Sequence, residues 1–208
     1  MKVGEIQAMG CLKNIFKAVV IVLAVVGFTS LGGKDYFVKL WTDFTNPPQD
    51  VMLERAKKVG DFSRIGDEYE IDKAASALGY TGVLAEHKAT GQKMVVVNSG
   101  KKPLLTPQDF KDGSVNKKLQ DLTERFKYQV INIQDLKITK KGYIKTFGQK
   151  APYVRFEAKA NKLPVGEIGG IISAVKTKSG ESKIIVSVNE KDKYSQIIAE
   201  DFFKKVRE

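Results

Sequence analysis

Five short segments after Tyr128 alternate apolar and polar residues with a period of two, and this pattern constrains the fold more than any other feature. The segments are Val130–Ile138, Tyr143–Phe147, Tyr153–Ala160, Gly170–Thr177 and Lys183–Val188. Turn-forming residues separate them: Lys140-Lys141-Gly142, Gly148-Gln149-Lys150-Ala151-Pro152, Asn161-Lys162-Leu163-Pro164 and Lys178-Ser179-Gly180-Glu181. Connections this short make neighbouring strands antiparallel. The sequence therefore predicts an antiparallel sheet at the centre of the fold.

A β-hairpin is predicted earlier in the chain. Its strands are Gly79–Lys88 and Gln92–Asn98, and Ala89-Thr90-Gly91 joins them. The run Met94–Val97 is apolar at every position, which is typical of a strand covered on both faces of its sheet. We therefore expect this strand to lie inside a covered sheet, with amphipathic helices supplying the cover.

Helices are predicted where an apolar stripe has a recognisable start or stop. One follows Asn46-Pro47-Pro48, with a stripe of Val51, Met52, Ala56 and Val59, and ends at Gly60. A shorter one covers Asp72–Leu78 and ends at Gly79. A third is capped by Thr106-Pro107-Gln108-Asp109, is interrupted at Gly113, and carries the stripe Val115, Leu119, Leu122 and Phe126. The last covers Tyr194–Val206, with Tyr194, Ile197, Ile198, Phe202 and Val206 as its buried stripe.

The N-terminal region holds the longest uncharged run of the chain. Its members are Ala18, Val19, Val20, Ile21, Val22, Leu23, Ala24, Val25, Val26, Gly27 and Phe28. With its flanks, residues 14–33, it would span roughly 30 Å as a helix, which is the thickness of the hydrocarbon core of a bilayer. The fold class predicted is therefore α+β, a mostly antiparallel sheet covered by amphipathic helices and preceded by an N-terminal transmembrane helix.

Two other interpretations of this segment remain open. A cleaved signal peptide needs only the apolar core plus a small-residue site, which Ser30-Leu31-Gly32 offers. The other is a buried core helix. Lys2, Lys13 and Lys17 precede the segment, and this slight bias favours a cytoplasmic N-terminus with the folded part outside the cytoplasm. The aromatic stretch Tyr36–Trp41 fits either an interfacial belt or ordinary core residues.

The chain divides accordingly. Residues 1–13 form a short tail, residues 14–33 the anchor or signal segment, and residues 34–208 an extracytoplasmic α+β domain. Within that domain, residues 34–78 are a helical lead-in and residues 79–208 contain the sheet and its helices.

The net charge of +11 is concentrated in one stretch. Residues 101–163 contain fifteen Lys or Arg and six Asp or Glu, a net charge of +9. The sequence predicts an anion or partner surface on one face or edge of the sheet, formed by Lys137, Lys140, Lys141, Lys145, Lys150, Arg155, Lys159 and Lys162. The competing interpretation is a solvated surface with lysines protecting edge strands from association.

Nucleic acid is a weaker candidate partner for this basic stretch. Tyr143, Phe147 and Tyr153 are interleaved with the lysines, as in surfaces that stack single-stranded bases. Lysine, however, predominates over arginine, which is better suited to bidentate phosphate recognition. Export of the folded part would also remove it from most nucleic acid.

The sequence predicts neither a catalytic nor a metal site, and no cofactor. Cys11 and His87 are the only cysteine and histidine, so zinc clusters and intrachain disulfides are excluded. His87 is interpreted as a turn or surface residue. The acidic run Asp67–Asp72 is interpreted as a charged connector, and Gly166-Glu167-Ile168-Gly169-Gly170 as a bend or bulge before a strand.

From Lys93 to the C-terminus the order of elements resembles that of the PsbP-like superfamily of small α/β/α sandwich domains. The likeness is carried by Met94–Val97, Val115–Phe126, Ile184–Val188 and Phe202-Phe203. The resemblance implies a non-catalytic module that binds or stabilises protein partners at or near membranes, and it transfers no functional residues.

These observations predict a membrane-anchored, non-catalytic binding or assembly module that contacts a membrane-associated protein or anionic lipid headgroups. The alternatives are an enzyme of a class with no readable motif, and a structural envelope protein with no tight ligand. The expected location is a single-pass membrane protein with an extracytoplasmic domain, or a secreted or lumenal protein after signal cleavage. The sequence makes no prediction of oligomeric state.

Overall fold

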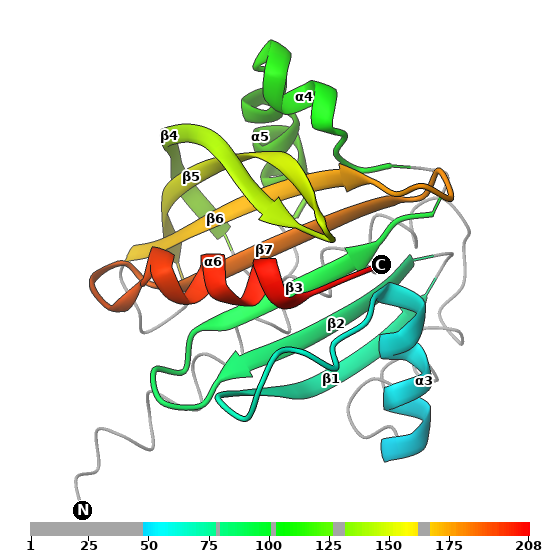
Figure 1. Ribbon diagram of the computed structural model, residues 1–208. Coiled ribbons are helices and arrows are strands. Elements are labelled where there is room, and N and C mark those ends of the chain that lie inside the picture. Colours follow the sequence, from blue (N-terminus) through cyan, green and yellow to red (C-terminus); the bar gives the residue numbers. More distant parts are fainter. Residues whose placement is uncertain (1–47, 78–79, 101–102, 127–131, 162–166) are drawn as a thin grey trace, which may run out of the picture.

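The computed structural model describes residues 48–77, 80–100, 103–126, 132–161 and 167–208 (Figure 1). Within them seven strands form one antiparallel sheet in the order β1-β2-β3-β7-β6-β5-β4. The strands are β1 (Tyr69–Ala77), β2 (Tyr80–His87), β3 (Lys93–Asn98), β4 (Asn132–Thr146), β5 (Gln149–Asn161), β6 (Glu167–Lys176) and β7 (Ser182–Glu190). The helices are α3 (Gln49–Val59), α4 (Pro107–Asp112), α5 (Val115–Phe126), the short 3-10 helix η1 (Lys191–Lys193) and α6 (Gln196–Lys205). The α+β class and the antiparallel sheet predicted from the sequence are confirmed.

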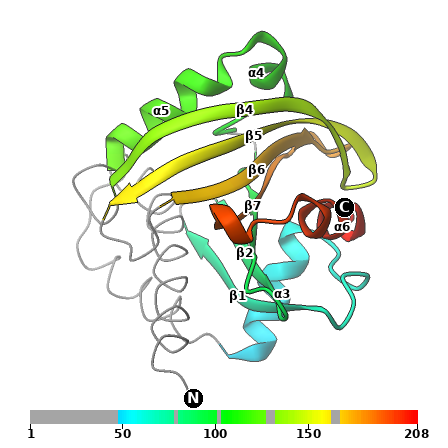
Figure 2. The same cartoon turned by 90° about the vertical axis from the view of Figure 1, so that its left-hand side faces the viewer.

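The sheet is strongly curved, and helices cover both of its faces (Figure 2). We call the side covered by α3 and α6 the concave face, and the side covered by α4 and α5 the convex face. Under the concave face the core is rich in aromatic side chains, with Phe202 and Phe203 fully buried. Under the convex face it is mostly aliphatic, with Leu84, Val95 and Val154 at its centre. Central strands therefore bury both faces, which explains the uninterrupted apolar run in β3.

Three predicted helices begin or end near their expected residues. α3 starts directly after Pro48 and stops at Gly60, with Ala56 and Val59 buried as expected. α4 carries the predicted capping box, and Gly113 ends it in the left-handed conformation at φ 83°. α6 covers the middle of the last predicted helix, with Ser195 as its N-cap. Local capping chemistry therefore determines both ends of α4 and the start of α6, whereas α3 has no side-chain cap.

The predicted helix over Asp72–Leu78 is wrong, because its described residues, up to Ala77, belong to strand β1. It pairs with β2 from Tyr69 opposite His87 to Ala77 opposite Tyr80. Its alanines favour a helix by intrinsic propensity, but pairing with β2 buries Ala74 in the concave core. Tertiary pairing therefore overrides local propensity here.

The predicted turn at Lys140-Lys141-Gly142 is also wrong, because these residues continue strand β4. Two predicted strands are thereby one strand of 15 residues, with register shifts between Gln134 and Lys137 and between Ile138 and Lys140. A Cβ atom on Gly142 would lie 2.9 Å from the ring of Tyr153, its partner on β5. The glycine therefore makes room for a cross-strand ring, and it does not mark a turn.

The chain reverses at Phe147 and Gly148, a turn of two residues between Thr146 and Gln149. Both residues have positive φ, 48° and 75°, as the tight turns of β-hairpins require. The turn predicted over Gly148–Pro152 is thus shorter than expected, and the rest of that segment is in β5. Phe147 is buried in the concave core, which holds a non-glycine residue in this unusual conformation.

Beneath this turn lies a buried lysine. The ammonium of Lys183 lies 5.1 Å from the centre of the Phe147 ring, and the residue is 6% exposed. Burial lowers the pKa of Lys183, and the charges of Glu181 and Glu208 offset only part of this effect. The charged form of this side chain is therefore less favourable in the folded state than in the unfolded state.

The variant Lys183→Met should be as stable as the natural protein at neutral pH, or more stable by about 1 kcal/mol. The pKa of Lys183 is lower in the folded state than its ordinary value of 10.5. At pH values between these two pKa values the unfolded state binds more protons than the folded state. Stability should therefore rise with pH in this range. The variant should lose this rise, measured as urea midpoints at pH 7 and pH 10. An unchanged rise in Lys183→Met would contradict this account, and Lys178→Met, at an exposed position, is the control.

The glycine-rich segment before the predicted strand Gly170–Thr177 is neither bend nor bulge over its described residues. Residues 167–170 are in β6, which pairs with β5 and β7 without a register shift. Gly170 lies opposite Phe156, and a Cβ atom there would approach the Phe156 ring to 2.7 Å. The ring occupies the space that this glycine leaves open.

One residue of the predicted stripe on the last helix is misplaced. Ile197 is 81% exposed, whereas Phe202 and Val206 are buried as expected. The buried side of α6 is completed by Ala199 and Phe203. Each directly follows a residue of the expected stripe, Ile198 or Phe202, and so lies about 100° further around the helix axis. Ile197 therefore faces away from the sheet.

Among the described residues, no helix is long and apolar enough to cross a membrane. The apolar segment 18–28, the aromatic stretch 36–41 and the cap Asn46 all lie outside the described residues. The predicted transmembrane helix therefore stays a prediction from the sequence.

Candidate binding surface

Seven of the eight cations proposed from the sequence lie on one hairpin, formed by β4 and β5. The eighth, Lys162, falls in a part of the chain that the structure does not describe. β4 is an edge strand of the sheet (Figure 1). Six of the seven side chains are exposed, and Arg155 is half-buried. The excess positive charge therefore lines one edge of the molecule.

The register of the hairpin divides these cations between the two faces. Ile144 and Ala151 point into the concave core, so their strand neighbours point the other way. Lys141, Tyr143 and Lys145 alternate along the convex side of β4, and Lys150 on β5 lies directly opposite Lys145. We call Lys141, Tyr143, Lys145 and Lys150 the Lys-Tyr patch. The sequence indicated one charged face or edge of the sheet. The described cations do lie on one edge hairpin, but they are divided between its two faces.

The concave side of the hairpin carries cations together with carboxylates. Lys159 pairs with Asp135 at 3.4 Å, and Lys191 of η1 pairs with Glu157 at 3.0 Å and with Glu167 at 2.9 Å. The hydrogen bond and charge of Lys191 lower the pKa of Glu167, with smaller effects from Lys159 and Lys137. On this side Lys159 is therefore neutralised within the fold, and Glu157 and Glu167 are neutralised by Lys191. Lys137 and Lys140 are exposed and have no ion pair among the described residues.

Arg155 on the concave side is held by an aromatic ring. Its guanidinium carbon lies 5.6 Å from the centre of the Tyr194 ring. The Arg155 Nε and the Tyr194 hydroxyl are both buried and have no hydrogen-bond partner among the described residues. Arg155 therefore packs against the start of α6 and does not extend toward the exposed edge.

The Lys-Tyr patch has no such compensation. Within the described part of the chain, no carboxylate lies within ion-pair distance of Lys141, Lys145 or Lys150. Lys145 and Lys150 face one another across the strands, an arrangement of like charges that is unfavourable in a sheet. Tyr143 is 58% exposed, and the Lys150 ammonium lies 4.8 Å from its ring centre. The patch is a compact positive surface built around an exposed ring.

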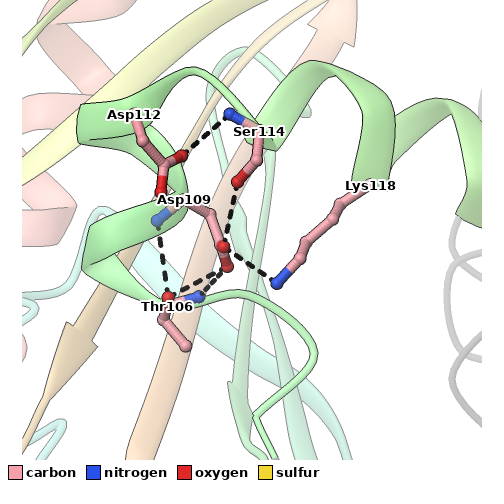
Figure 3. A network of polar contacts seen from close by, with 5 residues as sticks. All are labelled: Thr106, Asp109, Asp112, Ser114 and Lys118. Carbon is pink, nitrogen blue, oxygen red and sulfur yellow. Dashed lines mark hydrogen bonds and ion pairs between the residues drawn. The ribbon is translucent and has the colours of Figure 1, made fainter.

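The corner between α4 and α5 borders this patch. A Cβ atom on Gly113, at that corner, would lie 3.7 Å from the ammonium of Lys141. Figure 3 shows the polar network that fixes the corner around the buried carboxylate of Asp109. Asp109 accepts hydrogen bonds from the Thr106 amide at 2.7 Å and the Ser114 hydroxyl at 3.1 Å, and pairs with Lys118 at 2.8 Å. This carboxylate is therefore fully engaged within the corner.

Asp109→Asn tests this network through its dependence on pH. Burial alone would raise the pKa of Asp109, but hydrogen bonds from Lys118, Thr106 and Ser114 outweigh it and lower the pKa. A lowered carboxyl pKa stabilises the folded state above the unfolded value of 3.8, and this contribution is lost as the pH falls through the folded value. The variant should be less stable at pH 7, by about 2 kcal/mol, and the difference should shrink near pH 3.

Urea unfolding of the two proteins at pH 7 and pH 3 measures this difference. Asp121→Asn, at an exposed position on α5, is the control and should change stability little at either pH. A difference between Asp109→Asn and the natural protein that is the same at both pH values would refute the assigned role of the carboxylate.

His87, the single histidine of the chain, ends β2 at the turn of the β2–β3 hairpin. The Nδ1 of His87 lies 2.9 Å from the Thr90 hydroxyl in the hairpin turn, and its ring packs edge-on against Tyr69. Within the described ranges, no group of three His, Cys, Asp or Glu side chains is placed to hold a metal ion. His87 therefore packs within a turn, as interpreted from the sequence.

The acidic run Asp67–Asp72 divides between different roles. Glu68 forms an ion pair with Lys205 of α6, and Tyr69 donates its hydroxyl to Asp201 at 3.0 Å. Lys205 also lies 5.3 Å from the centre of the Tyr69 ring. These contacts join β1 to α6 and have no sequence signal, because the partners are more than 130 residues apart.

Of the three aromatic residues that suggested base stacking, only Tyr143 is exposed. Phe147 and Tyr153 are 4% and 5% exposed and belong to the concave core. The described hairpin therefore offers one ring to a ligand, where stacking of successive bases needs several.

No family model matches the chain, and no curated protein matches it in sequence.

Proposed function

We propose that the protein is a membrane-anchored, non-catalytic binding or assembly module that uses the cationic β4–β5 edge to contact a membrane-associated protein or anionic lipid headgroups. The observation that carries the proposal is the Lys-Tyr patch, whose three ammonium groups have no carboxylate partner among the described residues. Uncompensated like charges reduce stability, so a fold that keeps them side by side gains most from an anionic partner.

The competing explanation, edge protection, accounts for only part of the patch. Lysines on an edge strand prevent pairing with other chains, which fits Lys141 and Lys145 on β4. Lys150 lies on β5, an inner strand of the sheet that pairs with β4 along its whole length and with β6 from Tyr153 to Lys159. Edge protection does not require this third lysine, whereas an anion bound at the patch would be attracted by all three ammonium groups.

The anchor in this proposal comes from the apolar segment 18–28, which has the length and composition of a single membrane span. The sheet lies between two layers of helices (Figure 2), which is the layering that the resemblance to PsbP-like domains implies. That resemblance favours binding over catalysis. The extracytoplasmic location follows only from the distribution of lysines around the segment.

Substitution of the lysines separates this proposal from an enzyme. Lys141, Lys145 and Lys150 together changed to Ala should abolish capture of membrane components by the full chain, whereas His87→Ala should leave it intact. Capture is measured against both vesicles with anionic lipid and detergent-extracted membrane proteins. Capture that survives the loss of the lysines would refute the proposed surface.

Cell fractionation, N-terminal sequencing and protease accessibility test the anchor. We expect the intact chain in the membrane fraction, with the folded domain accessible to protease from the extracytoplasmic side. A mature product in the non-membrane fraction that begins near Gly33 would replace the anchor with a cleaved signal. A domain protected within the cytoplasm would refute the orientation.

A further inference from the structure

We propose that the Lys-Tyr patch docks directly on the surface of an anionic phospholipid bilayer. This inference rests on the proposed function and makes it specific, because it names lipid phosphate as the ligand and the convex side of the hairpin as the contact. It leaves the concave cations without a direct role in binding.

The geometry of the patch fits an extended, flat ligand. Lys141, Tyr143 and Lys145 occupy alternate positions of one straight stretch of β4, so the outer two lie about 13 Å apart. Lys150 adds a second row across from Lys145. No register shift interrupts the pairing between Lys141 and the turn. The charges therefore lie along one exposed ridge of the hairpin and do not surround a pocket.

The charge chemistry of the patch also favours lipid. All three cations are lysines, which act as mobile point charges, whereas specific recognition of a phosphorylated protein typically uses the fixed fork of arginine. The one arginine of the hairpin, Arg155, is on the other face and packs against Tyr194. Lipid headgroups are likewise mobile, so their phosphates can adapt to three point charges without a preformed cradle.

Tyr143 supplies the apolar part of the contact. It is exposed, lies between the lysines on the same face, and its ring is in contact with the charge of Lys150. Tyrosine favours the headgroup level of a bilayer, where its ring is in an apolar environment and its hydroxyl in a polar one. A single exposed ring among lysines is better suited to this role than to stacking of nucleic-acid bases.

The concave face shows what a compensated surface looks like on the same hairpin. There, Lys159 and Lys191 have carboxylate partners at 3.4 Å or less, and Arg155 packs on a ring. Lys137 and Lys140 form no ion pair on that side among the described residues, but Lys137 lies directly opposite Glu157. An anionic surface approaching that side would meet Asp135, Glu157 and Glu167 as well as cations. On the convex side, Lys141, Lys145 and Lys150 surround Tyr143, and no carboxylate of the described hairpin lies among them.

The test uses the full chain in vesicles, with a tryptophan reporter at the patch. Trp41, the only natural tryptophan, is changed to Phe, and the reporter is Tyr143→Trp, which keeps an amphipathic ring at the site. A second chain carries Ile197→Trp, at an exposed position on α6. Vesicles are either phosphatidylcholine alone or contain anionic phosphatidylserine, and both carry brominated acyl chains that quench nearby tryptophan.

We expect quenching of the Tyr143→Trp reporter in anionic vesicles only, reversed by high salt, and no quenching of the Ile197→Trp reporter. Each lysine near an anionic surface contributes about a fivefold factor, so loss of all three should weaken docking on the order of 100-fold. The variant with Lys141, Lys145 and Lys150 changed to Ala should therefore lose the quenching. A charge-matched control with Lys57, Lys58 and Lys204, exposed lysines of α3 and α6, changed to Ala should retain it.

Equal quenching in both kinds of vesicle, or quenching that survives loss of the three lysines, would overturn the inference. So would lysine-dependent binding of single-stranded oligonucleotides in place of vesicles. If the Tyr143→Trp reporter is not quenched in anionic vesicles but the lysines are still needed to capture a membrane protein, the lipid inference is refuted and the proposed function stands. If loss of the three lysines changes neither docking on vesicles nor capture of a membrane protein, the lipid inference and the proposed function are both refuted. Thermal unfolding confirms that each variant is folded, and Lys145→Ala should not lower Tm because it removes a like-charge pair.

Discussion

Gly170→Ala should destabilise the protein by about 3 kcal/mol. A Cβ atom on Gly170 would lie 2.4 Å from the backbone oxygen of Ser187 and 2.7 Å from the ring of Phe156. The partly buried ring packs against the convex core, and the backbone oxygen is part of the adjoining strand β7. The conflict must therefore separate β6 from β7 or displace Phe156. For a domain of this size the expected fall in Tm is about 10 °C, measured by thermal unfolding.

Gly82→Ala is the matched control, because it is also a strand glycine. A Cβ atom there would lie 3.9 Å from the Val96 oxygen and 4.0 Å from the Val97 side chain, which is ordinary contact. We expect its stability to remain within about 0.5 kcal/mol of the natural protein. If Gly170→Ala is as stable as Gly82→Ala, the close packing between β6, β7 and Phe156 is incorrect.

Gln92→Ala should also cost about 3 kcal/mol, since it removes three hydrogen bonds and leaves a buried cavity. The Gln92 amide donates to the Ser187 hydroxyl at 2.8 Å and to the Ser195 carbonyl at 2.9 Å, and its oxygen accepts from the Ser195 amide at 2.8 Å. Gln92 is fully buried, and Ser195 is the N-cap of α6. One side chain thus attaches the start of α6 to the centre of the sheet.

The expected result is a lower urea midpoint together with faster hydrogen exchange of the α6 amides. Gln149→Ala is the control, because Gln149 makes one exposed hydrogen bond, to the Lys176 carbonyl at 3.1 Å. It should cost less than about 1 kcal/mol. Gln92→Ala with unchanged exchange in α6 would show that this helix does not depend on the buried amide.

The parts of the fold that the sequence predicts correctly are those determined by neighbouring residues. The capping box at Thr106 and Asp109 and the alternation along β5 depend on contacts within a few positions. The errors occur where distant residues decide. Gly142 and Gly170 suggested a turn and a bend, but each makes room for a ring of β5, Tyr153 and Phe156 respectively.

The candidate site follows the same division. The sequence identifies the cations of the hairpin because they are concentrated in one stretch, and it indicates the edge on which they lie. It does not identify which of them are neutralised. Lys191 reaches Glu157 and Glu167 from η1, 24 or more positions away along the chain. The division into a compensated and an uncompensated face is therefore visible only in the folded structure.

The central claim is that the Lys-Tyr patch is covered by an anionic partner in the membrane. Hydroxyl-radical footprinting of the full chain in its native membranes tests this without any substitution, since Tyr143 and Ile197 are both highly exposed in the protein alone. We predict that Tyr143 is oxidised severalfold more slowly in membranes than in detergent, that high salt removes this protection, and that Ile197 reacts equally in both. Equal oxidation of Tyr143 in membranes and in detergent would contradict the claim.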